Sequence, residues 1–162
     1  MRTNEEITEI YYRYVDMIYR LCFTILKNTH DTEDSVQNTF IKLINHKKEF
    51  ENSEHEKAWL IRTATNISRD FLRKSSRKDT PLDEIEEKVP AEEHKTENID
   101  LLNAVLSLDE KYREVIFLYY YEGYNSNEIA ELLDKSASTI RSHLSEARTK
   151  LKIKLGGDYF EE

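Results

Sequence analysis

Apolar side chains recur along this chain at steps of three and four residues, the spacing of one face of an α-helix. The first such stripe runs from Ile7 to Ile25 and predicts a helix of about six turns. Cys22 lies inside the stripe, so we expect a packed thiol rather than a reactive one. Capping residues at 28–31 precede a second predicted helix at 32–46. Its buried face is expected to hold Val36, Phe40, Leu43 and Ile44.

The opposite face of this second helix carries a polar stripe that ends in an apolar residue. Asp34, Gln37 and Ile41 recur at i, i+3 and i+7 and therefore share one side of the helix. Two interpretations remain open at this point. The stripe is either an ordinary solvated surface or a surface that contacts another molecule.

A third helix, predicted over residues 57–74, is apolar on one side and cationic on the other. Its apolar stripe consists of Leu60, Ala64, Ile67 and Phe71. The same spacing, about 200° around the helix, is repeated by Arg62, Asn66, Arg69 and Arg73. Residues 57–78 hold seven Lys and Arg against the single acid Asp70, which favours a nucleic-acid face over a solvated one. Trp59 beside it could belong to the core or stack on an exposed base, and the core is the favoured interpretation.

The composition changes abruptly after this helix. Residues 79–97 contain both prolines and many carboxylates without a sustained apolar period, so we expect an extended, mobile linker. This segment accounts for most of the formal net charge of −8. Positive and negative charges thus lie in different parts of the chain. The net charge of the whole chain therefore describes neither of the two predicted DNA-facing surfaces.

Two further helices are predicted at 98–107 and 109–121, followed by a stop at Gly123. A helix-turn-helix follows, because Asn125 can cap one short helix and Ser136 the next. Between them, Asp134 occupies the position where a left-handed turn residue is expected. The last helix turns Ile140, Leu144, Ala147 and Leu151 inward and leaves Arg141, Ser145, Arg148 and Lys152 on its exposed flank.

Composition narrows the class of protein. The scarcity of Gly and Pro, three and two in 162 residues, indicates an all-α protein with two small helical domains. The single cysteine excludes an internal disulfide, and the scattered histidines show no spacing typical of a zinc site. We expect the protein to be located in the reducing cytoplasm, with no signal peptide and no insertion into a membrane. No carboxylate pair, activated nucleophile or phosphate-binding glycine loop is present, so we expect neither an enzyme nor a cofactor or metal.

Three segments in this order resemble the bacterial RNA polymerase sigma factors of the extracytoplasmic-function (ECF) group, within the sigma-70 family. "THDTEDSVQNTF" is similar to the segment that docks on the polymerase clamp. "AWLIRTATNISRDFLRK" is similar to the helix that engages the minus-ten promoter element. "LDEKYREVIFLYYYEGYNSNEIAELLDKSASTIRSHLSEARTKL" resembles the domain that reads the minus-thirty-five element. The resemblance implies a factor that binds core RNA polymerase and directs promoter-specific initiation.

The resemblance also implies a domain organisation and partners. Residues 1–78 would form a region 2-like domain, 79–97 the acidic linker, 98–156 a region 4-like domain and 157–162 a short acidic tail. The partners would be the clamp and flap regions of core RNA polymerase, promoter DNA and an anti-sigma factor, and the free protein would be a monomer.

Three sets of site residues follow from the same resemblance. Polymerase contact is implied for Asp31, Glu33, Asp34, Gln37 and Ile41. Contact with the minus-ten element is implied for Asn52, Ser53, Trp59, Arg62, Asn66, Arg69 and Arg73, with a loop in residues 49–56 that captures a flipped base. Contact with the minus-thirty-five element is implied for Ser138, Thr139, Arg141, Ser142, Ser145 and Arg148.

Three positions depart from the family pattern. Asp109 replaces a usual proline at a helix start and is expected to cap it, while Ser138 replaces a common glycine. Glu146 falls where the family often has arginine, which is expected to alter recognition of the distal element. Two rival classes are a helix-turn-helix regulator that needs no polymerase, disfavoured by the acidic linker, and a helical adaptor, disfavoured by the basic stripe.

Overall fold

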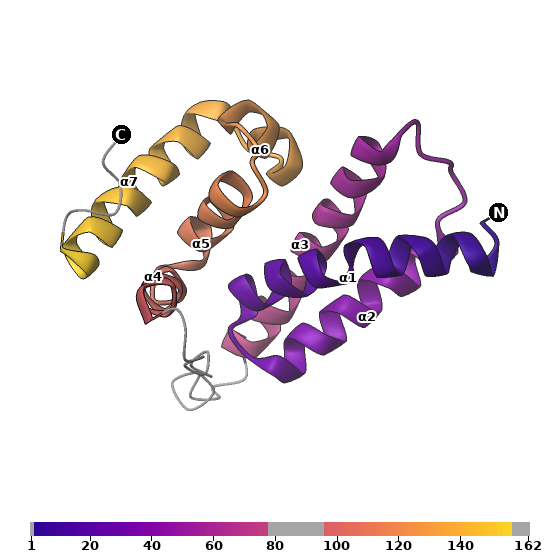
Figure 1. Cartoon of the computed structure of the whole chain (residues 1–162), viewed down its shortest axis with the longest axis horizontal. Helices are drawn as coiled ribbons and strands as arrows, with labels where there is room; N and C mark the ends of the chain where they lie inside the picture. The colour runs from indigo at the N-terminus through magenta and orange to yellow at the C-terminus, as the bar shows by residue number, and fades with distance from the viewer. Residues whose placement is uncertain (1, 78–95, 157–162) are drawn as a thin grey trace. The chain divides into compact units, whose positions relative to one another are not determined.

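The computed structural model describes residues 2–77 and 96–156, which divide into two compact units. The first contains α1, α2 and α3, and the second contains α4 to α7 (Figure 1). The described residues form helices and no strand, which confirms the predicted all-α class. The predictions for the acidic linker, apart from its last two residues, and for the tail at 157–162 lie outside the described residues.

The first unit is a bundle in which α1 (Asn4–Leu26), α2 (Thr29–Asn45) and α3 (Ser53–Arg77) each pack against the other two. Helix α1 begins with a capping box, in which the backbone N–H of Glu6 donates to Thr3 Oγ1 at 3.1 Å and that of Thr3 donates to Glu6 Oε2 at 3.2 Å. The core is built from fully buried side chains, among them Ile18, Leu21, Ile25, Leu43, Leu60 and Ile61. Each such side chain contributes about 1.5–3 kcal/mol through its burial.

The buried face of α2 differs from the predicted one at its carboxyl end. Ile44 was expected in the core, but 47% of it is exposed. The side chains that complete the buried face are instead small and polar, with Ser35 and Thr39 fully buried beside Leu43. Because Ile44 lies about 100° around the helix from Leu43, it falls outside this face.

The second unit consists of α4 (Thr96–Leu106), α5 (Glu110–Ile116), a π-helical turn η2 (Phe117–Tyr121), α6 (Ser126–Leu133) and α7 (Ala137–Leu155). The predicted helix-turn-helix is confirmed in α6 and α7. Asn125 and Glu128 form a capping box, Asp134 takes the left-handed conformation with φ 54°, and Ser136 Oγ accepts from the backbone N–H of Thr139 at 3.2 Å. All four of the predicted inward residues of α7 are buried.

The start and end of α5 differ from prediction. Asp109 is the N-cap residue, but its side chain makes no capping hydrogen bond. The expected single helix over 109–121 changes at Phe117 into the π-helical turn, where the backbone N–H of Glu122 donates to Phe117 O at 3.2 Å. One extra residue in that turn shifts Tyr119 and Tyr120 around the helix axis relative to a regular α-helix. None of the described helices combines the length and apolar character needed to cross a membrane.

Candidate functional site

The outer face of α2 carries the stripe seen in the sequence. The carboxylate of Asp34 lies 3.5 Å from His30 Nε2, one turn earlier, and Gln37 is exposed. Ile41 is 45% exposed on the side of the helix opposite the core, and the equally exposed Ile44 lies close to it. The stripe therefore combines acidic, amide and apolar groups on one accessible surface.

The amino-terminal end of the same helix orders two further acidic residues. The side chain of Asn28 caps the helix by accepting from the backbone N–H of Asp31 at 2.8 Å, and its amide donates to Asp31 Oδ2 at 3.1 Å. Asp31 is half-buried, whereas Glu33 is exposed. Carboxylates at this end interact favourably with the helix dipole, so Asp31 also stabilises α2.

Helix α3 separates its apolar and cationic sides as predicted. Leu60 and Ala64 are fully buried, while Arg62 and Asn66 are exposed on the opposite side. The other two members of the stripe are less available. Arg69 is half-buried, and Arg73 pairs with Asp70 three residues earlier. Arg62 and Asn66 are thus the members of this stripe best placed to meet a nucleic acid.

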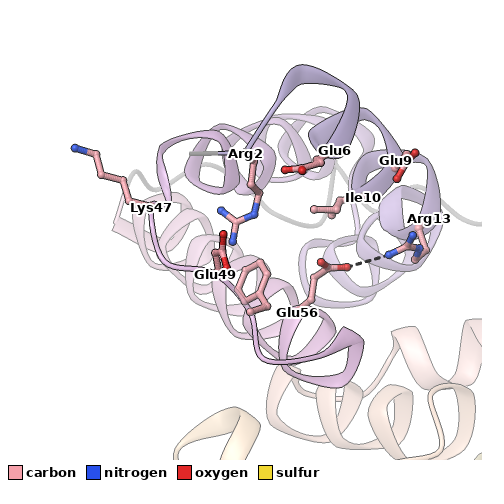
Figure 2. Close-up of a pocket in the computed structure, with 9 residues that line it drawn as sticks. Arg2, Glu6, Glu9, Ile10, Arg13, Lys47, Glu49 and Glu56 are labelled. Carbon is pink, nitrogen blue, oxygen red and sulfur yellow. Dashed lines mark hydrogen bonds and ion pairs between the residues drawn. The ribbon is translucent and has the colours of Figure 1, made fainter.

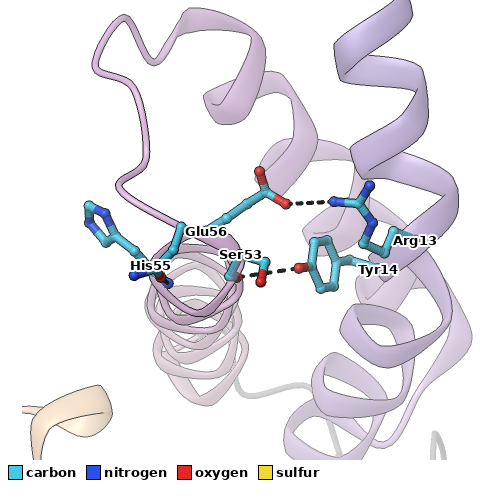
Figure 3. Close-up of polar contacts among 6 residues, drawn as sticks. Arg13, Tyr14, Ser53, His55 and Glu56 are labelled. Carbon is cyan, nitrogen blue, oxygen red and sulfur yellow. Dashed lines mark hydrogen bonds and ion pairs between the residues drawn. The ribbon is translucent and has the colours of Figure 1, made fainter.

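Two residues predicted to meet DNA at the start of α3 have structural contacts. Asn52 Oδ1 accepts from the backbone N–H of His55 at 2.8 Å and so caps the helix. The Ser53 side chain is exposed, but its backbone carbonyl accepts from Tyr14 Oη at 3.4 Å (Figure 3). The hydroxyl of Ser53 remains accessible, whereas the amide oxygen of Asn52 is engaged.

Trp59 belongs to an aromatic cluster rather than standing free. Its ring centroid lies 4.6 Å from that of His46 and 5.7 Å from that of Phe50, and the residue is half-buried. Burial, with the positive charge of Arg2 nearby, lowers the pKa of His46. A neutral imidazole is therefore favoured in this cluster, as expected for a ring packed between two aromatic side chains.

A hollow of about 350 Å³ lies between the start of α1 and the connection from α2 to α3 (Figure 2). An ion pair of 3.2 Å between Arg13 and Glu56 closes one side of it, and Arg2 and Lys47 lie along another. The lining alternates acidic and basic groups around the ring of Phe50. Sequence patterns gave no sign of this hollow, because it joins segments more than 30 residues apart.

The exposed flank of α7 presents short hydroxyl side chains and basic groups. Arg141, Ser142 and Ser145 are exposed. Ser138 and Thr139 instead form a local network at the helix start, in which the hydroxyl of Ser136 lies 3.2 Å from that of Ser138 and 2.8 Å from that of Thr139. Of the basic residues predicted on this flank, Arg141 near the start of the helix and Lys152 near its end are exposed.

Arg148, in contrast, is held by tyrosines from the π-helical turn. Its Nε donates to Tyr120 Oη at 2.7 Å, and its guanidinium lies over the rings of Tyr119 at 5.3 Å and Tyr120 at 5.7 Å. The hydrogen bond to Tyr120 raises the pKa of Arg148. The positive charge is thereby fixed in direction at one edge of the flank.

Glu146 is held in a similar way on the other side of α7. Tyr112 Oη donates to Glu146 Oε2 at 2.6 Å, which raises the pKa of Tyr112. The carboxylate is thus turned toward α5. The tyrosine partners of Arg148 and Glu146 were not found from the sequence, because such contacts join distant positions; Tyr112 and Glu146 are 34 positions apart. The repeated tyrosines of "LYYYEG" were the only local signal for the partners of Arg148.

Comparisons with known proteins identify the family of this chain. The Sigma-70 region 2 family model matches residues 10–78, and the Sigma-70, region 4 model matches residues 99–151. The chain is similar to the ECF RNA polymerase sigma factor SigM of Bacillus subtilis, with 31% identity over 90% of this chain and 93% of that protein. It is also similar to SigW of the same organism, with 30% identity over 88% of this chain and 84% of that protein.

Solved structures give the same result. The sigma factor RpoE from Bartonella quintana, solved in complex with the anti-sigma factor NepR, matches with a TM-score of 0.79 and 25% identity, over 93% of this chain and 97% of that one. CnrH, solved in complex with the cytosolic domain of CnrY, shares the fold with a TM-score of 0.62 and 22% identity, over 94% and 89% of the two chains. Both family models and the relatives that span nearly the whole chain lead to one conclusion: this protein belongs to the ECF group of RNA polymerase sigma factors.

Proposed function

We propose that this sigma factor directs promoter-specific initiation through three separate surfaces, one for polymerase and two for DNA. The observation that carries the proposal is the outer face of α3, where Arg62 and Asn66 are exposed on the side opposite the fully buried Leu60 and Ala64. Guanidinium and amide groups suit phosphates and base edges, and this unit matches the Sigma-70 region 2 family model. Supporting the proposal further, SigM and SigW are RNA polymerase sigma factors by name.

The polymerase-binding surface is the outer face of α2. The exposed side chains of Gln37, Ile41 and Ile44, with the carboxylate of Asp34 beside them, combine an apolar centre with polar neighbours. This composition is typical of a protein interface, in which an apolar core is surrounded by a polar rim. Asp31 and Glu33 extend the surface toward the start of the helix and face the clamp of the polymerase.

The minus-ten element is met by α3 and by the connection that precedes it. Arg62 and Asn66 contact the melting strand directly, while Arg69 and Arg73 supply positive charge behind them. The accessible hydroxyl of Ser53 and the ordered connection before it take the flipped base. Trp59 acts from within its aromatic cluster, by supporting this connection, rather than as a free stacking platform. The capping role of Asn52 serves the same end.

The minus-thirty-five element is met by α7, the second helix of the helix-turn-helix. Arg141 reaches a base edge or a phosphate, and Ser142 and Ser145 line the groove with hydroxyls. Arg148, fixed by its two tyrosines, binds a phosphate at the edge of the groove. Ser138 and Thr139 contribute through the ordered start of the helix.

Two further partners belong to the proposal. RpoE from Bartonella quintana was solved with an anti-sigma factor, which supports a protein inhibitor for this chain as well. The flap of the polymerase would hold the second unit near the distal element. A factor that acts with RNA polymerase works where the polymerase is, so the expected cytoplasmic location follows from the proposed function.

The double substitution Arg62→Ala and Asn66→Ala tests the assignment of α3. Both side chains point away from the core, so we expect normal folding and normal holoenzyme assembly but an open-complex yield reduced by about tenfold or more, the effect of losing about 1–3 kcal/mol of contact free energy. Permanganate footprinting of unpaired thymines on a cognate promoter measures the yield. Lys74→Ala is the matched control, because Lys74 is exposed on the same helix about 120° from Arg62. An open-complex yield equal to that of the wild type would make the stripe a solvated face.

A further inference from the structure

The connection between α2 and α3, residues 46–52, is tied to Arg2, which lies two positions before the start of α1. The guanidinium of Arg2 donates from Nη1 to His46 O at 2.5 Å and from Nη2 to Lys48 O at 2.6 Å. Its Cζ also lies 4.4 Å from the centroid of the Phe50 ring. A single side chain thus contacts the first, third and fifth residues of this seven-residue loop. Figure 2 shows the Arg2 side chain directed toward Glu49 of the same loop.

Two contacts from α1 hold the far end of the same connection. Tyr14 Oη donates to Ser53 O at 3.4 Å, and Arg13 pairs with Glu56 at 3.2 Å (Figure 3). These contacts fix where α3 begins, and Arg2 fixes the path of the loop that leads there. Arg2 and the amino-terminal half of α1 therefore act together as a support for residues 46–52.

The chemistry of the three contacts requires arginine. A guanidinium is planar and presents several N–H donors in a rigid fork, so it can serve two carbonyls and still place its face over an aromatic ring. A lysine ammonium carries the same charge but has no such fork. Phe50 connects the contacts of Arg2 to Trp59, because the centroids of the Phe50 and Trp59 rings are 5.7 Å apart.

We propose that Arg2 is a positioning residue for promoter selectivity, holding residues 46–52 in the shape in which they discriminate the base at the minus-ten element. This inference rests on the proposed role of that loop in base capture. Arg2 itself touches no DNA in this account. It acts through the backbone of His46 and Lys48 and through the ring of Phe50.

The first test reads the loop without polymerase or DNA. Trp59 is the only tryptophan of the chain and belongs to the cluster that Arg2 supports, so its fluorescence reports the packing of the loop. In Arg2→Met, we expect acrylamide to quench Trp59 about twofold more efficiently than in the wild type, because loosely packed loop residues open more often. The matched control is Arg20→Met, which removes the same charge from an exposed position on α1. Unchanged quenching in Arg2→Met would show that Arg2 does not hold the loop, and would overturn the inference.

The second test reads selectivity. Holoenzymes made with wild type, Arg2→Met and Arg20→Met would be compared on a cognate promoter and on variants with each other base at every minus-ten position. We expect Arg2→Met to lower the preference for the cognate base by about tenfold at one position, the discrimination supplied by one good base contact, with core affinity unchanged. Arg20→Met should keep the wild-type preference.

The two tests separate failure of the inference from failure of the proposed function. Increased quenching of Trp59 with an unchanged base preference would show that the loop is clamped but that Arg2 does not set selectivity, and would overturn the inference alone. A wild-type holoenzyme without any preference at the minus-ten positions would overturn the proposed function, and the inference would fall with it.

Discussion

Cys22 shows how a single residue is defined by its surroundings. The thiol is fully buried in α1, and burial raises its pKa from 9.0 to about 11. A thiol reacts as the thiolate, and reagents must also reach it. Both conditions fail here, which confirms the packed thiol expected from its position inside the apolar stripe.

We therefore expect Cys22 to react with a disulfide reagent such as DTNB only when the first unit opens. At pH 8 the native protein should release almost no thionitrobenzoate within minutes, and the protein in 6 M guanidinium chloride, a strongly denaturing concentration, about one equivalent. The absorbance at the thionitrobenzoate band measures the release. Stoichiometric reaction of the native protein within the mixing time would contradict the burial.

The same pKa predicts a pH dependence of stability. The folded-state pKa is raised, so the neutral thiol contributes fully to the free energy of unfolding below pH about 9, and this contribution is lost as the pH rises through about 11. Over that window the loss amounts to about 2–3 kcal/mol. Denaturant titrations of wild type and Cys22→Ala at several pH values isolate it, because the other titrating groups are common to both proteins. A difference between the two that does not change from pH 8 to 11 would contradict the prediction.

Helix α2 has one buried face and one exposed face that can bind a partner. Ile41 and Ile44 expose 45% and 47% of their surface with Gln37 and Asp34 beside them. Two neighbouring exposed isoleucines favour a partner, because covering the exposed half of each side chain would be favourable by about 0.7–1.5 kcal/mol. The exposure of Ile44, which the sequence did not predict, enlarges the apolar centre of the surface.

We expect Asp34→Lys to weaken binding to core polymerase by about tenfold or more without lowering stability, because its carboxylate is partly exposed and pairs only with the exposed His30 in the described structure. Asp16→Lys is the matched control, since it makes the same charge change at an exposed position of α1. Fluorescence anisotropy of labelled protein titrated with core enzyme measures the affinity. Equal affinities for the two variants would remove the polymerase surface from α2.

The helices themselves could largely be predicted from the sequence, because their signals are local. The caps at Asn125 and Ser136 and the left-handed Asp134 lie within a few residues of the helices that they delimit. Contacts between distant segments could not be predicted. Arg2 with residues 46–52 and Tyr112 with Glu146 join side chains more than 30 positions apart, where neither periodicity nor spacing carries information.

The candidate site divides along the same line. The stripe of α3 was predicted in position and direction, yet pairing of Arg73 with Asp70 and the partial burial of Arg69 reduce what it exposes. On α7, Arg148 was expected on the exposed flank, but it is half-buried and held by Tyr119 and Tyr120. These tyrosines reach Arg148 from the π-helical turn. The extra residue of that turn could not be recognised from the spacing of apolar residues in the sequence.

The whole molecule explains how an acidic chain can select DNA. The formal net charge is −8, but residues 79–100 hold nine acids against two lysines and so carry most of this excess, while cations lie on one face of α3 and along α7. Such local surfaces attract phosphates only once they are held close to DNA, because the net charge opposes approach from a distance. In this account, polymerase supplies most of the affinity and the sigma factor supplies the choice of sequence.

This division of roles can be tested by comparing the isolated protein with its holoenzyme on one labelled promoter duplex and on a scrambled duplex at the same salt concentration. We expect the protein alone to bind both duplexes equally and weakly, with Kd about 10⁻⁴ to 10⁻⁶ M, the range of non-specific binding. With core RNA polymerase, we expect a specific complex on the promoter that the scrambled duplex does not form. Tight binding of the promoter by the isolated protein, with discrimination against the scrambled duplex, would rule out this division of roles and indicate a regulator that needs no polymerase.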